Sequence, residues 1–329
     1  MTAPVLPTVP NSNRARLEQV IPLSTPYKIY IDPSSVCNFG CQFCPHSAPA
    51  LYRRVQPKHG IMSLDLFRSI LDDISKFDRK IKMIELYSYG DPLMNPHISE
   101  IACELVRASV AERTRIKSNG ALLTQQLAES LAAAQLDMIL FSVLSSDEEE
   151  YRRISGRKVN YAALVDNIGR LYSMRGKTRI YVKIIKDYFT SAGMDKLRDD
   201  FGDKCDFIVT EKLYGINRTD LKDFYMGKPR KLSGDAVVCP YPFYQLTVNW
   251  DGEVSSCCVD WTRNIIFGNV KSEHLKDIWN GSTLREFQRM QLQGRRTENK
   301  SCATCDFIQE NRIDNIDSYR KEILDKLPH

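Results

Sequence analysis

Three cysteines occupy one short stretch near the start of the chain. Cys37, Cys41 and Cys44 follow the spacing C-x3-C-x2-C. Three thiolates can hold three corners of a cuboidal iron–sulfur cluster and leave the fourth iron open to a small molecule, whereas four thiolates close the cluster. Structural zinc sites usually take four protein ligands, so the spacing favours an open cluster over zinc or purely structural cysteines.

A second group of cysteines lies in the last third of the chain. Cys239, Cys257, Cys302 and Cys305 would supply four thiolates, the last two from a C-x2-C knuckle. Metal binding can fold such separated residues into one small module. An iron–sulfur cluster and a zinc ion both suit four thiolates, so both stay open. Cys258 is left over, as an alternative ligand, a buried thiol or a hydrogen-atom donor.

Elements that could position these cysteines alternate between strand and helix from residue 27 to residue 211. Such alternation implies parallel strands joined by right-handed crossovers. Six units are too few for a closed eight-fold barrel, so we predict an α/β fold with an open, partial (β/α)6 barrel; a doubly wound sheet is the alternative. The predicted strands are 27–31, 81–87, 114–117, 138–143, 179–185 and 206–210, and the main predicted helices are 64–76, 97–110, 124–135 and 160–174.

Polar turns follow the second, third and fourth of these strands. They are Gly90-Asp91-Pro92, Ser118-Asn119-Gly120 and a segment that begins at Ser142. In either α/β fold ligands bind at the carboxyl ends of the strands, where the first cysteine loop also lies. A glycine turn at such an end lets the backbone approach a ligand closely.

Composition and charge narrow the class of protein. The 329 residues are 43% hydrophobic and 26% charged, with a net charge of +5 spread along the chain. We therefore expect no nucleic-acid partner, which would need a clustered basic face. No apolar run approaches the ~20 residues that span a bilayer, and the N-terminus lacks a secretion signal. We expect a cytoplasmic protein, in which ten cysteines indicate metal rather than disulfides.

The predicted parts follow one another along the chain. Residues 212–236 are polar and broken by Gly and Pro, which marks a linker. After it, Asp251-Gly252 would form the turn of a hairpin in the cysteine-bearing module. The predicted domains are a lead-in at 1–26, the barrel at 27–211, the linker at 212–236, the module at 237–310 and a C-terminal helix at 311–329.

The first cysteine motif and the polar turns together resemble the radical S-adenosylmethionine (radical SAM) superfamily. Tyr89 to Pro92 resemble its G-G-E-P loop, with Tyr89 and Asp91 as departures, and Ser118 to Gly120 resemble its T-N-G turn. The resemblance implies that the three cysteines hold a [4Fe–4S] cluster, whose open iron binds S-adenosylmethionine for cleavage to a 5′-deoxyadenosyl radical. The implied cofactor-binding residues are Phe43, Tyr89, Gly90, Asp91, Pro92, Ser118, Asn119, Ser142, Arg153 and Arg157.

The second cysteine group resembles the SPASM and twitch modules attached to radical SAM enzymes. Gly252 and Cys257 match their G-x4-C pattern, and four cysteines fit the single-cluster, twitch-like form. The spacing is similar to that of the dehydrogenase type acting on 2-deoxy-scyllo-inosamine. This resemblance implies a second, auxiliary [4Fe–4S] cluster and an electron donor such as flavodoxin or ferredoxin.

We therefore expect hydrogen abstraction from a polar small molecule, a sugar or cyclitol, followed by its oxidation. The alternatives are epimerisation with Cys258 returning hydrogen, modification of a peptide, and a non-catalytic iron–sulfur or zinc protein. Glu211 and Lys183, near strand ends, are candidate substrate bases. Glu85 and Tyr87 belong to the second strand, and the sequence leaves open which face they occupy.

Overall fold

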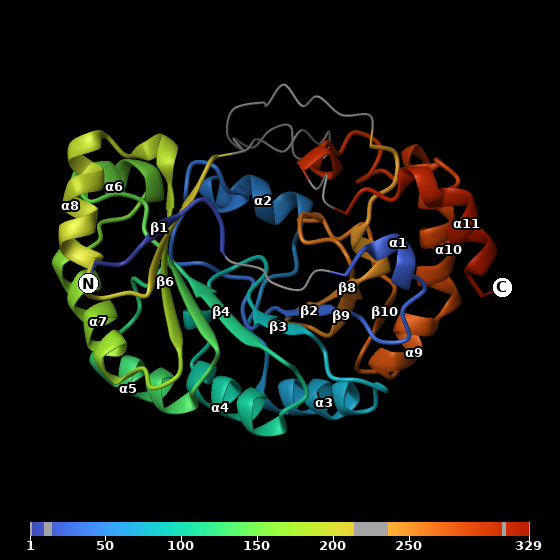
Figure 1. Cartoon of the computed structure of the whole chain (residues 1–329), viewed down its shortest axis with the longest axis horizontal. Coiled ribbons are helices and arrows are strands. Elements are labelled where there is room, and N and C mark those ends of the chain that lie inside the picture. The colour runs from blue at the N-terminus through green and yellow to red at the C-terminus, as the bar shows by residue number, and fades with distance from the viewer. Residues whose placement is uncertain (1, 10–14, 214–235, 311–313, 329) are drawn as a thin grey trace.

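A ten-stranded sheet runs through the computed structural model, which describes residues 2–9, 15–213, 236–310 and 314–328. Its strand order is β1-β7-β6-β5-β4-β3-β2-β8-β9-β10 (Figure 1). The strands are β1 (Val5–Leu6), β2 (Lys28–Ile31), β3 (Met83–Leu86), β4 (Thr114–Ser118), β5 (Met138–Ser142), β6 (Arg179–Ile185), β7 (Phe207–Glu211), β8 (Gln245–Val248), β9 (Glu253–Ser255) and β10 (Gly268–Asn269).

Strands β2 to β7 form the predicted open half barrel. Each pairs in parallel with the next, and helices cover the convex outer face (Figure 1). The predicted fold class is confirmed, and the predicted strands and helices named above differ from the observed ones by no more than two residues at either end. The helices are α1 (Leu17–Val20), α2 (Pro49–Val55), α3 (Leu64–Ser75), α4 (Ile98–Ala108), α5 (Gln125–Ala134), α6 (Glu148–Ser155), α7 (Tyr161–Met174), α8 (Ser191–Phe201), α9 (Leu275–Asn280), α10 (Ser282–Leu292) and α11 (Arg320–Lys326).

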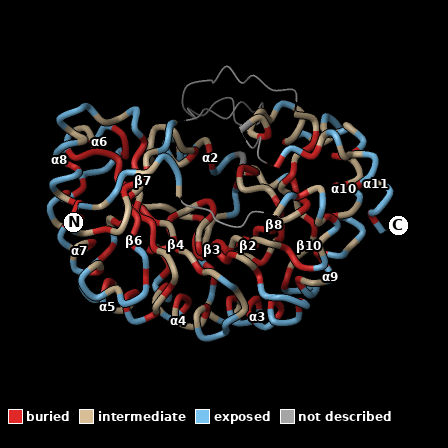
Figure 2. The backbone as a smooth tube through the Cα atoms, in the orientation of Figure 1, coloured by how far each residue is buried: buried red, intermediate tan, exposed pale blue. Residues whose placement is uncertain are grey.

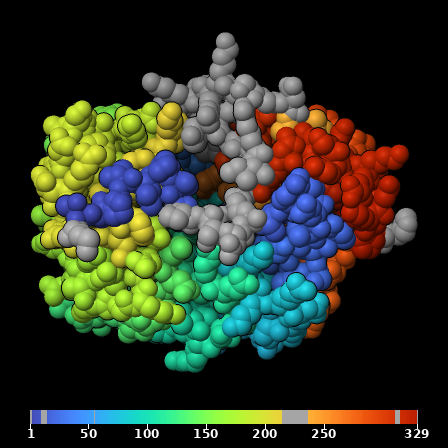
Figure 3. Space-filling model, in the orientation of Figure 1, coloured from blue at the N-terminus to red at the C-terminus, as the bar shows by residue number. Residues whose placement is uncertain are grey.

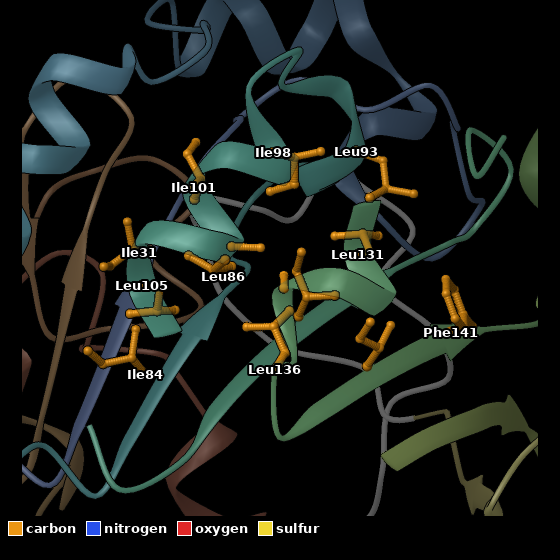
Figure 4. Close-up of a cluster of buried hydrophobic side chains, with 14 of the residues drawn as sticks. Ile31, Ile84, Leu86, Leu93, Ile98, Ile101, Leu105, Leu131, Leu136 and Phe141 are labelled. Atoms are coloured by element: carbon orange, nitrogen blue, oxygen red, sulfur yellow. The ribbon is translucent and has the colours of Figure 1, made fainter. Parts of the chain in front are cut away.

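The main hydrophobic core lies between the sheet and these helices. Ile84 and Leu86 of β3 pack with Ile101 and Leu105 of α4, and all four are no more than 1% exposed (Figure 4). Figure 2 shows the burial that results along the strands. Because successive side chains of a strand point to opposite faces, the alternate residues, such as Glu85, point to the concave side. We call this concave inner face of the half barrel the lumen.

The C-terminal module continues the same sheet. Strand β8 pairs in parallel with β2, with Lys28 opposite Gln245, and β9 and β10 follow it in antiparallel order. The predicted hairpin is confirmed, and Gly252 in its turn has φ +90°, which suits glycine. The sequence suggested a separate module, because β8 could not be matched from sequence to the free edge of a strand more than 200 residues earlier.

Two described parts of the N-terminal lead-in pack against the rest of the chain. β1 pairs with β7 at the far edge of the sheet, and in Figure 3 this segment (dark blue, left) lies opposite the module (red, right). Leu17 and Ile21 pack in a second buried cluster with Ile323 and Leu327 of the C-terminal segment. Most of the predicted linker, 212–236, lies outside the described residues. In the part of the chain that is described, no helix is long and apolar enough to cross a membrane.

Candidate active site

The first cysteine loop lies at the carboxyl end of β2, as predicted. Gly40 and Gln42 donate backbone hydrogen bonds to the carbonyls of Ser155 (2.8 Å) and Ile154 (2.9 Å) at the end of α6. The loop is therefore held against the barrel wall by main-chain contacts rather than by its cysteines. All three thiols line one cavity of about 160 Å³, which opens at the carboxyl ends of the strands.

Gly90 is fixed by its contact with this cysteine loop. A Cβ atom at this position would lie 2.3 Å from the carbonyl oxygens of both Ser34 and Val36. The neighbouring Asp91 N–H donates to the same Val36 carbonyl at 3.0 Å. The backbone of the loop after β3 thus packs directly against the backbone of the cysteine loop, and only a residue without a Cβ atom fits at this contact.

Asp91 holds two strand ends together. Its carboxylate accepts hydrogen bonds from the Ser118 hydroxyl (2.9 and 3.0 Å) and from the backbone N–H groups of Asn119 (2.7 Å) and Leu93 (2.9 Å). Burial raises the pKa of Asp91, although these donors oppose the rise. The carboxylate replaces the family's glutamate, and its observed bonds place the β3 and β4 loops relative to each other.

Asn119 reaches from the β4 end to the cysteine loop. Its side-chain amide donates to Asn38 Oδ1 at 2.8 Å, and its nitrogen lies 3.8 Å from Cys37 Sγ. Ser142, at the end of β5, lines the same cavity. Phe43 also lines it and stacks on Tyr188 with ring centroids 6.0 Å apart. The cavity therefore brings together predicted residues from four different loops, whereas Pro92 is not among its lining residues.

Tyr89 connects the cavity with the second module. Its hydroxyl donates to the Cys257 carbonyl at 3.0 Å, and its own carbonyl lies 2.8 Å from His46 Nε2. Trp261 packs edge-on against its ring at 5.1 Å and also lines the cavity. The departure from glycine at this position thus supplies a contact between the barrel and the module.

The two arginines predicted for the cofactor lie outside this cavity. Arg153 is exposed and pairs with Glu150 at the surface of α6 (Nε–Oε2, 2.7 Å). Arg157 lines a different hollow, on the other side of the cysteine loop beside Gly40. The family resemblance implied a place at the cofactor for them, but α6 (Glu148–Ser155) and the turn at Gly156 place both outside this cavity.

The candidate bases lie at the lumen side of the cavity. Lys183 lines it, and its Nζ is 3.1 Å from the half-exposed carboxylate of Glu211. Tyr87 lines the same cavity. Glu85 also faces the lumen, where it is fully buried and accepts ion pairs from Lys28 Nζ (3.0 Å) and Lys117 Nζ (2.8 Å). The structure thereby decides the strand faces that the sequence left open.

The thiols of the first loop are protonated at neutral pH unless a metal cluster binds them. Burial raises the pKa of Cys37 to about 12 and that of Cys44 to about 11. Burial and the adjacent Cys44 raise the pKa of Cys41 as well. Binding of a metal cluster would replace these protons, because the thiolate is the ligand form.

The second group of cysteines gathers beside the lumen. Burial raises the pKa of Cys239 well above its usual value, and Cys302, Cys305 and Cys258 add to the rise through their proximity. Gln291 of α10 links two members: its Oε1 accepts the Cys239 N–H at 3.2 Å, and its Nε2 lies 3.8 Å from Cys302 Sγ.

Cys258, the cysteine left over in the sequence, lies near both the second cysteine group and the lumen. Burial raises the pKa of its thiol, while Lys28 and Lys117 of the lumen oppose the rise. Cys257 contributes its carbonyl to the bond with Tyr89, and its N–H donates to Ser255 Oγ at 3.1 Å. Both cysteines therefore stay candidates for the fourth ligand, and Cys258 lies toward the lumen.

Both cysteine groups fit clusters by their donor chemistry. The first offers three thiols and an open cavity, and the second offers thiols on converging segments. Within the described residues, no three Cys, His, Asp or Glu side chains are arranged to hold a single metal ion.

An open parallel barrel with three cysteines at the end of its first strand is an arrangement that suits an iron–sulfur enzyme. The radical SAM superfamily model matches residues 31–186, and the SPASM model, an iron–sulfur cluster-binding domain, matches residues 239–306. The chain belongs to the radical SAM superfamily and carries a SPASM domain. It is therefore an enzyme that uses a [4Fe–4S] cluster and S-adenosylmethionine, and its SPASM domain implies an auxiliary cluster.

Relatives of this chain span most of its length at low identity. The tungsten-containing aldehyde ferredoxin oxidoreductase cofactor-modifying protein of Pyrococcus furiosus is 22% identical over 87% of this chain and 90% of its own. The S-adenosyl-L-methionine-dependent 2-deoxy-scyllo-inosamine dehydrogenase of Niallia circulans is 20% identical over 85% and 92%. A crystal structure of BtrN in complex with AdoMet and 2-DOIA covers 85% of this chain and 92% of that one, with TM-score 0.55 and 18% identity, which supports the fold.

Sequence reasoning missed the charged residues of the lumen. Arg115 and Lys117 of β4, like Lys28 of β2, face inward beside Glu85. The available signal was the period-2 alternation of charged and apolar residues in these strands, since charged residues rarely occupy the helix-covered face.

Proposed function

We propose that this radical SAM enzyme oxidises a hydroxyl-bearing polar small molecule, such as a sugar or cyclitol. The observation that carries the proposal is that both cysteine groups border one lumen. The first lines the cavity directly. The second meets it at Tyr89, which lines the cavity and donates a hydrogen bond from its hydroxyl to the Cys257 carbonyl at 3.0 Å. The neighbouring Cys258 lies near Lys28 and Lys117 of the lumen. A substrate in the lumen would thus lie between the two groups.

The residues present fit the implied cofactors. Cys37, Cys41 and Cys44 would hold the [4Fe–4S] cluster, and the strand-end loops at Gly90, Asn119 and Ser142 would hold S-adenosylmethionine. Cys239, Cys302 and Cys305, with Cys257 or Cys258, would hold the auxiliary cluster. When bound, these groups supply removal of a hydrogen atom from an unactivated C–H bond and acceptance of the remaining electron.

The chain itself supplies orientation and a proton acceptor. Oxidation of an alcohol also releases the hydroxyl proton, which we assign to the Glu211 carboxylate beside Lys183. The 3.1 Å ion pair holds the Glu211 carboxylate beside Lys183, which lines the cavity. Trp261 and Tyr89 close the module side of the cavity with apolar surface, which limits the access of water. The Niallia circulans relative, by its name a dehydrogenase of a cyclitol amine, supports this reaction class.

Anaerobic reconstitution tests the proposal. Wild-type protein should bind about eight irons per chain, two cuboidal clusters' worth, and should convert S-adenosylmethionine to 5′-deoxyadenosine under reduction. Cys41→Ala should abolish that conversion and retain about half of the iron. Incubation with deuterated sugars and cyclitols should then move deuterium into 5′-deoxyadenosine and form a ketone. Deuterium transfer without formation of a ketone would refute oxidation and would support only hydrogen abstraction from the substrate.

Epimerisation is the second candidate, because Cys258 lies toward the lumen. Its thiol could return a hydrogen atom to the opposite face of a substrate, provided that Cys257 ligates the auxiliary cluster. One electron from the external reductant and one proton from water would then restore the thiol. A stereoisomer of the substrate, with solvent deuterium at one carbon, would identify this reaction. Cys258→Ala should then stop formation of the stereoisomer and still allow deuterium transfer to 5′-deoxyadenosine. Unchanged formation of the stereoisomer would exclude Cys258 as donor.

A further inference from the structure

The lumen gathers more positive than negative side chains. Among the described residues, six charged side chains in two ion-paired groups occupy the inner faces of β2, β3, β4, β6 and β7. Its carboxylates are Glu85 and Glu211. Its cations are Lys28, Arg115, Lys117 and Lys183. We call these six residues the lumen charge cluster; it carries a formal excess of two positive charges.

Three of the cations share a single carboxylate. Glu85, whose side chain is 0% exposed, pairs with Lys28 at 3.0 Å, with Lys117 at 2.8 Å and with Arg115. The side chains of these cations are only 12–22% exposed. One carboxylate cannot balance three cations, and unbalanced charge away from water is costly. The cluster is therefore electrostatically incomplete on its own.

Other acidic groups near the cavity are engaged elsewhere. The Asp91 carboxylate faces the Ser118 hydroxyl and the Asn119 N–H rather than a lysine. Tyr30 and Tyr87 face the lumen as neutral phenols, since burial raises the pKa of both. Cys258 lies near Lys28 and Lys117, so a cluster-bound thiolate there would offset part of the charge. Lys183 lies at the mouth, with the half-exposed Glu211 as its ion-pair partner.

Two of the cations are placed to meet a ligand. Lys117 and Lys183 both line the cavity that also holds the cysteine loop and Ser142. They come from β4 and β6, on either side of β5, whose Ser142 pairs in register with Lys183. Lys183 lies close enough to Lys117 for the two charges to repel, which adds to the lowering of the Lys117 pKa that burial mainly causes. An anion between them would relieve this repulsion in a site partly screened from water.

We propose that the substrate carries an anionic group, a phosphate or a carboxylate, which binds between Lys117 and Lys183. This inference rests on the proposed function and specifies its substrate as an acidic sugar or cyclitol, such as a sugar phosphate or a sugar acid. Flexible ammonium groups suit either anion, because they act as compact point charges with several donors. A protonated amino sugar would instead meet two like charges at the same position.

Binding of small anions to the reconstituted holoenzyme tests this assignment. Isothermal titration with inorganic phosphate and with succinate, with and without S-adenosylmethionine, should show saturable binding that neutral myo-inositol lacks. Lys183→Gln and Lys117→Gln should each weaken anion binding about ten- to hundredfold, as expected for loss of one charge-assisted contact. Lys183→Arg should restore most of it. Lys177→Gln, an exposed lysine just before β6, should bind like wild type.

The outcomes separate the inference from the proposed function. Preference for phosphate or for succinate identifies the anionic group. Equal affinity of wild type and both glutamine variants, or binding of myo-inositol as tight as that of the anions, would overturn the inference. Lys183→Gln guards against misfolding of Lys117→Gln, because it disturbs the half-exposed Glu211 rather than buried Glu85. Conversion of S-adenosylmethionine to 5′-deoxyadenosine without anion binding would refute the inference alone; anion binding without conversion would refute the proposed function alone.

Discussion

Glu85 offers the sharpest test of the lumen's electrostatics. Its side chain is fully buried and accepts ion pairs from Lys28, Lys117 and Arg115. Burial opposes its ionisation, but the three cations outweigh burial and hold the pKa of Glu85 well below its usual range. Glu85→Gln keeps the shape of the side chain and removes its charge. Three partly buried cations would then face one another without a counter-ion.

The expected cost follows from that geometry. Removing one partner of a buried ion pair typically costs about 3–5 kcal/mol, because the other charge stays buried and unpaired. Surface pairs contribute about 0–1 kcal/mol. Glu104→Gln is the matched control: it removes the carboxylate that pairs with the exposed Arg68 at 2.7 Å on the outer helices. We expect the thermal midpoint of Glu85→Gln to fall by several degrees, and that of Glu104→Gln by about one degree or less.

The pH dependence gives a second measurement. The folded-state pKa of Glu85 is depressed, so its contribution to stability is present above the unfolded pKa and disappears as pH falls through the lower folded pKa. The difference in thermal midpoint between wild type and Glu85→Gln should be full near pH 7 and shrink in acid. A midpoint change no larger than that of Glu104→Gln at neutral pH would refute the assignment of Glu85 as the counter-ion of the lumen.

Three further predictions concern the loops and the cavity. Gly90→Ala should lower stability by at least about 1–3 kcal/mol and remove most of the cluster iron, since its Cβ would lie 2.3 Å from two backbone oxygens. Gly193→Ala, where the nearest atom is 3.3 Å away, is the control. Equal iron contents of the two variants would contradict the role of Gly90. Sulfate binding should weaken as pH rises through about 8, because burial lowers the pKa of Lys117 to about 8 and the side chain is neutral above that pH. Lys117→Arg should remove this pH dependence. A pH dependence that persists in Lys117→Arg would exclude Lys117 as its source. Tyr89→Phe should lower stability by about 1 kcal/mol, because it removes the 3.0 Å hydrogen bond from the Tyr89 hydroxyl to the Cys257 carbonyl. An unchanged unfolding midpoint would show that this hydrogen bond does not stabilise the contact between barrel and module.

The sequence alone determined the class of chemistry and the order of the elements. Cys37, Cys41 and Cys44 lie on one loop, so their spacing specifies a shared site without long-range information. The same holds for Gly90, Asn119 and Ser142, because each lies at or just after the end of a strand, and the ends of parallel strands meet at one edge. Helix starts were also local: Ser63 caps α3 by accepting the Leu66 N–H at 3.3 Å.

Only the tertiary structure decided which side chains share the lumen. Arg153 and Arg157 follow the right strand and still lie outside the cavity, because the direction of α6 depends on packing. The pairing of β8 with β2, across more than 200 residues, brings Cys258 toward Lys28. Glu85, Lys117 and Lys183 come from three separate strands, and their charges meet because the sheet curves around them. Strand spacing predicts that such residues alternate between two faces, but curvature and register determine which face closes around a substrate.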